Sequence, residues 1–192
     1  MCGRYTLGEL DETDILQDIL GKVTYCFDPR DEKLWNREIY PTAHAPVLTQ
    51  QREIVLSKWG FDRVRGAGVI FNARSETLLQ SGFWKKYLPN GRCVVPAKNY
   101  FEWEHVGKKT GDKYIFLRPQ NRPLYFAGIT DVRSPSHPYA VITRSASQNL
   151  RFVHDRMPLI LTEDMLSAWL DPIMDPKLLI LESPPLECRR IE

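Results

Sequence analysis

Short apolar runs recur along the chain, and turn-forming residues separate them. Pro46 to Thr49 and Glu53 to Trp59 flank Gln50-Gln51-Arg52, and this pattern predicts a β-hairpin. Other runs are rich in β-branched and aromatic residues, as strands usually are. These runs predict strands at 91–96, 99–103, 113–117, 124–130 and 138–143.

Helical periodicity is weaker and is confined to two segments. Residues 11–20 carry apolar side chains at 15, 16, 19 and 20, and Gly21 follows as a stop signal. Thr162 is a candidate N-cap for a helix that runs to about Leu170, with acidic residues in its first turn. The proline at 172 ends that segment.

Strands and helices do not alternate regularly, so a doubly wound parallel sheet is not expected. The pattern favours an α+β fold with a largely antiparallel, curved β-sheet core, barrel-like or bifurcated, flanked by helices. A chain of 192 residues with 43% hydrophobic and 26% charged residues suits a single globular domain over 1–192. We expect its last few residues to form a flexible tail.

The net charge and the absence of targeting signals say little about the function of the protein. The net charge of +2 does not by itself indicate nucleic-acid binding, although a local basic surface is compatible with it. The N-terminus does not resemble a signal peptide, and no run approaches the ~20 apolar residues of a membrane span. We expect a monomeric cytoplasmic protein, associated with the nucleoid in a bacterium, that needs no cofactor.

The four cysteines do not predict a metal site. Cys2, Cys26, Cys93 and Cys188 form no C-x-x-C pair and no zinc-type spacing with histidine. In a reducing compartment they are expected to be free thiols. Cys26 and Cys93 lie in strand-like runs and should be buried, whereas Cys188 lies in the polar tail and should be inert.

Cys2 is different because removal of Met1 would make it the N-terminal residue. It would then carry an α-amine with a reference pKa of about 7.7–8.0 and a thiol with one of about 8.5. The amine can condense with an aldehyde to an imine, and the thiol can close the imine to a five-membered thiazolidine. Taken alone, Cys2 is better interpreted as a small residue that follows the initiator, and the rest of the sequence reverses this interpretation.

Four polar clusters stand out among the apolar runs. Each has a structural alternative: Asn72 can form a turn, Glu102 can face water from a strand, and His154 can be structural. The clusters are Cys2-Gly3-Arg4-Tyr5, Phe71-Asn72-Ala73-Arg74-Ser75-Glu76-Thr77, Pro96-Ala97-Lys98-Asn99-Tyr100-Phe101-Glu102-Trp103 and Val153-His154-Asp155-Arg156-Met157-Pro158.

Together and in this order, the clusters resemble the SRAP (SOS response-associated peptidase) family over nearly the whole chain. The sequence departs from the family pattern at 35–42, where the family tends to have Tyr-Asn a few residues before the Pro-Thr, and at 143–146, where the family more often has a second Thr. The resemblance implies a protein that detects abasic sites in single-stranded DNA, including sites at junctions with duplex DNA. It also implies a stable thiazolidine crosslink between Cys2 and the abasic sugar.

The resemblance further implies which residues form the site. The catalytic residues are Cys2, Asn72, Glu102 and His154. Asn72 suits orienting the Cys2 amine or a sugar hydroxyl, and Glu102 suits proton transfer. His154 can position a sugar hydroxyl or a phosphate, or move a proton. Arg4 and Arg74 suit phosphate binding, whereas Trp59 and Phe61 can stack on a base or pack in the core. Further DNA-binding residues are Pro41, Thr42 and Arg156, of which Arg156 can instead brace its loop.

Two other functions remain open. The family name suggests a cysteine peptidase in which His154 activates Cys2, and cleavage of its own chain after Met1 would fit this function. However, no known protease signature surrounds Cys2. A non-enzymatic reader of modified DNA would need the aromatic and basic residues and no free amine. An AP lyase activity is also compatible with an imine. An adduct with abasic single-stranded DNA that survives denaturation distinguishes crosslinking from the peptidase and the reader.

Overall fold

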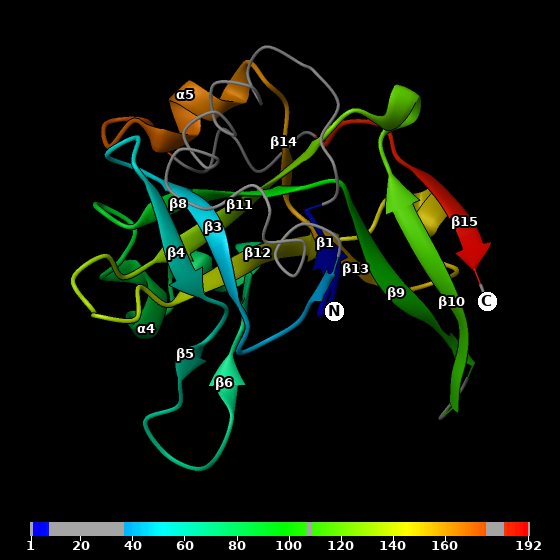
Figure 1. The fold of residues 1–192 in the computed structure, drawn as a ribbon, viewed down its shortest axis with the longest axis horizontal. Helices are drawn as coiled ribbons and strands as arrows, with labels where there is room; N and C mark the ends of the chain where they lie inside the picture. The colour runs from blue at the N-terminus through cyan, green and yellow to red at the C-terminus, as the bar shows by residue number, and fades with distance from the viewer. Residues whose placement is uncertain (1, 8–36, 107–108, 176–182, 192) are drawn as a thin grey trace.

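The computed structural model describes residues 2–7, 37–106, 109–175 and 183–191 (Figure 1). Two large sheets dominate this part of the chain, and their strand orders run from one edge to another without closing into a barrel. The pairing is antiparallel except for one short parallel pair, β7 with β12. The fold is therefore α+β with a largely antiparallel core, as the sequence predicted.

The larger sheet contains eight strands. Its main path is β13-β12-β11-β8-β3-β4, while β14 pairs with β11 and β7 pairs with β12. The strands are β3 (His44–Thr49), β4 (Ile54–Lys58), β7 (Asn72–Arg74), β8 (Arg92–Ala97), β11 (Leu124–Thr130), β12 (Tyr139–Ser145), β13 (Arg156–Pro158) and β14 (Ile160–Leu161).

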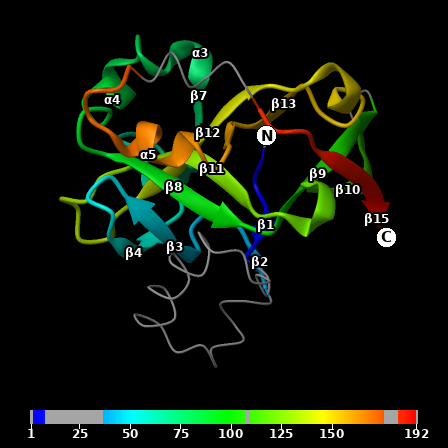
Figure 2. The same ribbon diagram turned by 90° about the horizontal axis from the view of Figure 1, so that it is seen from above.

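The second sheet has five strands in the order β15-β10-β9-β1-β2, and β5 (Phe61–Asp62) forms a separate pair with β6 (Val69–Ile70). Only Lys98 separates β8 from β9, so the chain crosses there from one large sheet to the other (Figures 1 and 2). The strands of this sheet are β1 (Tyr5–Thr6), β2 (Glu38–Ile39), β9 (Asn99–Val106), β10 (Lys109–Leu117) and β15 (Glu187–Ile191).

In the part of the chain that the structure describes, the helices are few and short. They are α3 (Ser75–Leu78), α4 (Gly82–Lys85) and α5 (Met165–Leu170), with 3₁₀ turns at Pro119–Asn121 and Gln148–Leu150. No helix among the residues that the structure describes is long and apolar enough to cross a membrane.

The two faces of the larger sheet contribute to two hydrophobic cores, because successive side chains of a strand point to opposite faces. One core joins this sheet to the five-stranded sheet and contains Tyr5, Trp59, Phe126 and Tyr139. The other joins it to the helices and includes Trp169 of α5. Cys93 is fully buried, as predicted, whereas Cys26 and the helix expected at 11–20 lie outside the described residues.

The predicted strands and the hairpin are confirmed, but both predictions about the C-terminal part need correction. The last helix begins at Met165 rather than beside Thr162, whose hydroxyl donates to Asp164 and so does not cap the helix. It does end at Leu170, before the proline. The expected flexible tail is instead strand β15, in which half-buried Cys188 pairs with Phe116 of β10.

Candidate functional site

The side chain of Tyr5 anchors the N-terminal segment inside the molecule. Tyr5 lies on β1 between β2 and β9, is fully buried, and shares a 2.7 Å hydrogen bond with the hydroxyl of Tyr139. Its ring packs edge-on against Trp59 at 5.2 Å. This anchor fixes the position of Cys2, whose side chain is also fully buried.

Asn72 is in direct contact with Cys2. Its side-chain amide on β7 donates to the Cys2 carbonyl oxygen at 2.8 Å. The parallel pairing of β7 with β12 aligns Asn72 with Val141 and so places this amide beside the N-terminal segment. Asn72 is therefore a ligand of the Cys2 backbone, and the turn alternative is excluded because it lies on a strand.

Glu102 is buried on β9 and only 5% exposed, so it does not face water. Burial raises the pKa of its carboxyl to about 6. Burial also raises the pKa of the Cys2 thiol, and the charge of Glu102 adds to that increase. Glu102 and Cys2 therefore act on one another electrostatically, and the thiol is protonated at neutral pH until another group takes its proton.

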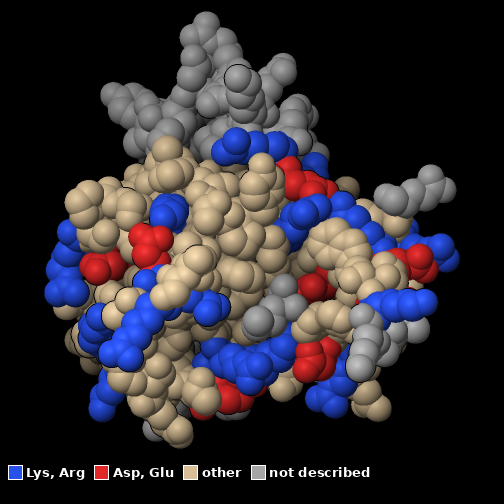
Figure 3. All heavy atoms as spheres, turned by 90° about the horizontal axis from the view of Figure 1, so that it is seen from below, with Lys and Arg blue, Asp and Glu red and all other residues tan. Residues whose placement is uncertain are grey.

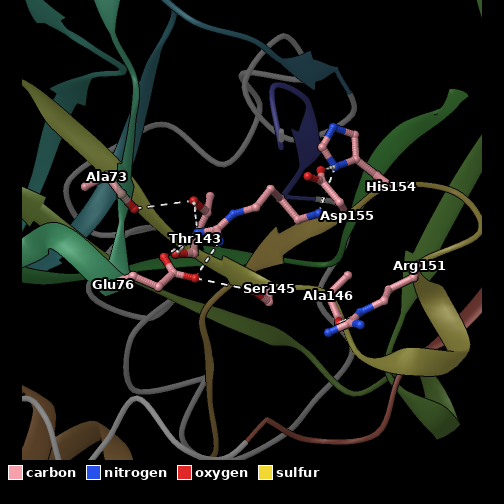
Figure 4. Close-up of polar contacts among 9 residues, drawn as sticks. Ala73, Glu76, Thr143, Ser145, Ala146, Arg151, His154 and Asp155 are labelled. Atoms are coloured by element: carbon pink, nitrogen blue, oxygen red, sulfur yellow. Dashed lines mark hydrogen bonds and ion pairs between the residues drawn. The ribbon is translucent and has the colours of Figure 1, made fainter. Parts of the chain in front are cut away.

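His154 lies just before β13 with its imidazole mostly buried. Its Nδ1 accepts a hydrogen bond from the backbone N–H of Arg156 at 2.8 Å. Asp155 Oδ1 lies 2.9 Å from the same nitrogen, but Asp155 is 85% exposed and can be solvated by water (Figure 4). The amide thus fixes the tautomer with the proton on Nε2. Burial lowers the pKa of His154 to about 4, so the ring is neutral at pH 7.

Arg156 braces the loop next to His154. Its guanidinium forms two hydrogen bonds with Glu76, at 2.5 and 2.9 Å, and donates to the Thr143 carbonyl oxygen at 2.7 Å. Figure 4 shows Ala73 of β7, Glu76 of α3 and Thr143 of β12 gathered at this point. The geometry favours the bracing role that the sequence left open for Arg156.

Arg4 and Arg74 differ in their surroundings. Arg4 lies over the ring of Trp103 at 4.9 Å and forms a 3.0 Å ion pair with Glu38, which leaves its side chain 38% exposed. Arg74 is exposed at the end of β7, immediately before α3. Both guanidinium groups are therefore accessible from solvent, as phosphate binding requires.

Trp59 and Phe61 are core residues. Trp59 is fully buried, donates its indole N–H to the Phe71 carbonyl oxygen at 2.9 Å and stacks on Tyr139. Phe61 is 4% exposed and packs edge-on against Trp84. The expected stacking on DNA bases is therefore corrected in favour of the core-packing alternative, because neither ring is available to a ligand.

Gly60, between these two aromatic residues, has a structural reason to be glycine. Its φ is +120°, and a Cβ atom there would lie 2.6 Å from a methyl group of Val69. Its N–H donates to the Tyr139 carbonyl oxygen at 2.7 Å. A side chain at this position would collide with Val69, so the close approach of β6 requires glycine here.

Pro41 and Thr42 form a turn between β2 and β3. Thr42 has a φ of +78°, which is unusual for a β-branched residue. Its N–H donates to the Trp59 carbonyl oxygen at 2.7 Å while its side chain remains exposed. Strained backbone of this kind costs of the order of 1–3 kcal/mol and is concentrated at functional sites.

Sequence reasoning missed several neighbours of the site. The ring of His105 lies 4.7 Å from that of His154, and Trp103 supports Arg4. Glu38 bridges Arg4 and Lys113, which it contacts at 3.0 and 2.6 Å. Trp103 follows Glu102 within a recognised motif, so it could have been found, but nothing in the sequence pairs Glu38 with Arg4.

Basic side chains are prominent on the face toward which the β5–β6 hairpin points. In Figure 3, Lys and Arg atoms outnumber acidic ones around the middle of this face. Because the whole chain has a net charge of only +2, this distribution is local. Among the described residues, no group of three or more His, Cys, Asp or Glu side chains has the arrangement of a metal site.

Comparison with known proteins places this geometry in context. The sequence matches the family model described as SOS response associated peptidase (SRAP) over residues 1–189. The chain belongs to the SRAP family. It is 31% identical over 187 residues to the abasic site processing protein YoqW of Bacillus subtilis, an alignment that covers 90% of this chain and 81% of YoqW.

A second SRAP relative and a solved structure are also similar. The abasic site processing protein YedK of Escherichia coli is 26% identical over 185 residues, with 88% of this chain and 79% of YedK covered. The crystal structure of a protein from Bacteroides thetaiotaomicron superposes with a TM-score of 0.76 at 19% identity, covering 100% of this chain and 92% of the other. At this identity the structural likeness supports the fold alone.

Proposed function

We propose that this protein processes abasic sites in single-stranded DNA by forming a covalent thiazolidine crosslink through Cys2, after removal of Met1. The observation that carries the proposal is the meeting of Cys2 with Asn72 and Glu102 in one buried place. The SRAP relatives named for abasic site processing support the choice of substrate. The crosslink would shield the lesion from strand scission.

The first step is opening of the abasic sugar and attack on its aldehyde. The closed hemiacetal must lose its ring bond, which requires one proton to leave a hydroxyl and another to reach the ring oxygen. Glu102, with a pKa of about 6, can exist in both protonation states near neutral pH and suits both transfers. The free α-amine of Cys2 then adds to the carbonyl carbon to give a carbinolamine.

Loss of water and ring closure follow. A protonated Glu102 donates to the carbinolamine hydroxyl, water leaves, and a protonated imine remains. The Cys2 thiol gives its proton to the resulting carboxylate as its sulfur bonds to the imine carbon. The ring closes with a secondary amine, and one water molecule is released overall. The raised pKa of the thiol makes this base necessary.

Asn72 and His154 hold the reactants. The side-chain amide of Asn72 donates a hydrogen bond to the Cys2 carbonyl oxygen. This bond restricts rotation of the Cys2 backbone, which would otherwise be free at a chain terminus. Neutral His154 offers its Nε2 proton as a hydrogen-bond donor to a sugar hydroxyl or a phosphate oxygen. Because its pKa is low, His154 is a poor general base at pH 7.

Accessible cations would bind the DNA backbone. We assign Arg4 and Arg74 to phosphates, because both are exposed and guanidinium groups pair with phosphate oxygens bidentately. The strained turn at Pro41 and Thr42 is assigned to contact with the strand. Arg156 is assigned to bracing, because Glu76 and Thr143 already bind its guanidinium.

The proposal is tested by incubating the purified protein with a single-stranded oligonucleotide that carries one abasic site. A shifted band that survives denaturation is expected, and the same oligonucleotide with an intact base should give none. A peptidase or a non-covalent reader would form no such adduct. Intact mass should show loss of Met1 before reaction and addition of DNA minus one water afterwards. An unreactive protein whose mass shows a free Cys2 would refute the proposal.

A further inference from the structure

Glu76, Thr143 and Arg156 form a connected set that joins α3, β12 and β13. The guanidinium of Arg156 is 11% exposed and binds both carboxylate oxygens of Glu76 together with the carbonyl and hydroxyl oxygens of Thr143. We propose that Glu76 is a positioning residue for His154: by fixing Arg156 it keeps the Arg156 amide on Nδ1 and the imidazole proton on Nε2. This inference rests on the role of His154 in the proposed function.

The Glu76–Arg156 contact is a charged pair with two parallel hydrogen bonds, a geometry that restricts the guanidinium in direction as well as in position. Ser145 adds a third contact to the carboxylate, its hydroxyl lying 3.4 Å from Oε1. The hydrogen bond from Arg156 is the main reason that the pKa of Glu76 falls to about 2. Glu76 is therefore ionised throughout the pH range in which a histidine titrates.

Arg156 connects Glu76 to His154, because its side chain contacts Glu76 and its backbone contacts the imidazole. The residue that Glu76 holds by its side chain donates its own backbone N–H to the imidazole, two residues away. Arg156 also begins β13, where it pairs with Ser145, and the adjacent carbonyl of Asp155 accepts from the Ala146 N–H at 2.9 Å. Losing the carboxylate would free the first residue of β13 and so loosen the donor on Nδ1.

The environment of His154 gives this loosening a measurable effect. Burial is the main cause of its lowered pKa, and the positive amino terminus and His105 lower it further, whereas Asp155 and the backbone hydrogen bond with Arg156 raise it. Asp155 also acts on Glu102, whose pKa it raises. When the loop loosens, water reaches the ring and Nδ1 loses its donor. The entry of water favours the protonated imidazole and moves its pKa toward the reference value of about 6.5, and the loss of the donor on Nδ1 frees the tautomer.

The test replaces Glu76 with Gln and follows His154 by ¹⁵N NMR across a pH series on the free protein. In the wild type we expect the Nε2–H tautomer and titration near pH 4. In E76Q we expect the pKa to rise by about 1 or more and the tautomers to mix. The matched control is E163Q, which breaks a second bidentate pair, Arg118 with Glu163 at 2.7 and 3.2 Å. That control should leave His154 unchanged.

A second variant keeps the test decisive if E76Q folds poorly. R156K retains the charge of Arg156 and its backbone N–H but loses the planar fork, so it should shift the pKa of His154 in the same direction. E76D keeps the carboxylate and should recover part of the wild-type behaviour. A folded E76Q or R156K in which His154 titrates as in the wild type would overturn the inference.

Crosslinking provides a separate readout. E76Q should slow adduct formation at pH 7 by roughly tenfold, a fraction of the 10²–10⁴ that a positioned acid or base contributes. The E163Q control should react at the wild-type rate. If the wild type itself forms no adduct, the proposed function fails while the NMR result still decides whether Glu76 positions His154.

Discussion

Replacing Glu102 with Gln should make the folded protein more stable near neutral pH while making it a poorer catalyst. Glu102 is 5% exposed, and its pKa rises from an ordinary 4.5 to about 6 on folding. Because the folded pKa is the higher one, its favourable contribution is fully present below pH 4.5 and is lost as the pH rises through 6. The rise in pKa corresponds to about 2 kcal/mol of folding stability, which the wild type loses by pH 7 and which a protein with Gln at this position would keep.

His154 has the opposite effect and must be separated from Glu102. Its pKa falls from 6.5 to about 4 on folding, so its contribution makes stability rise with pH over that interval. In the wild-type curve the two contributions therefore cancel in part. The difference between E102Q and the wild type isolates Glu102, because both proteins contain His154.

Urea unfolding of both proteins at several pH values between 4 and 8 measures this difference. The free energy of unfolding of E102Q, relative to that of the wild type, should increase by up to about 2 kcal/mol between pH 4.5 and 7. A difference that does not change with pH would refute the reasoning that burial raises the pKa of Glu102.

The same variant should crosslink more slowly. Single-turnover reaction with an abasic oligonucleotide should slow by roughly 10²-fold or somewhat less, and the rate should lose most of its pH dependence on the acidic side. Binding should change less than about threefold, because Gln keeps the shape and part of the hydrogen bonding. Crosslinking at the wild-type rate would make His154 the leading candidate for the acid.

Other substitutions test separate parts of the site. Cys2→Ala should abolish the denaturation-resistant adduct while binding to abasic DNA persists in a gel-shift titration, and Cys2→Ser should give only a reversible imine; a wild-type yield from Cys2→Ala would exclude the thiazolidine. Arg4→Ala or Arg74→Ala should weaken binding equally across sequences and reduce the slope of log K against log salt by up to ~0.7, whereas losses confined to certain sequences would indicate base readout. Glu76→Gln should lower stability above pH 4.5 by at most about 1 kcal/mol, since Glu76 is half exposed, and acid unfolding should show this difference vanish toward pH 2.

Most of the sheet could be predicted from the sequence because its strands carry their own pattern. The hairpin at 46–59 and strands such as 124–130 are long, apolar and bounded by turn residues. Strand β7 was not predicted, because three residues are too few to show an alternation of apolar and polar side chains. Its parallel partner β12 is also distant in sequence. β15 is rich in charged residues, and only pairing with β10 makes it a strand.

The candidate site was found from its motifs, but its internal contacts were not. The sequence grouped Asn72 with Cys2 without indicating that the amide binds a backbone carbonyl. Trp59 looked equally suited to a base or to the core, and burial with a partner for its indole N–H decided the question. Such partners depend on tertiary packing, which no local pattern records.

The burial of Cys2 by distant partners also bears on how the protein is made. Cys2 leaves the ribosome before Asn72, Glu102 and His154, and the last of these follows it by ~10 s at ordinary rates of synthesis. During that time the residue is an unprotected thiol, exposed to cellular oxidants and small aldehydes. Folding then closes the two sheets over it. Completion of the fold therefore shields this thiol, and the rate at which Cys2 becomes resistant to an alkylating reagent measures that completion directly.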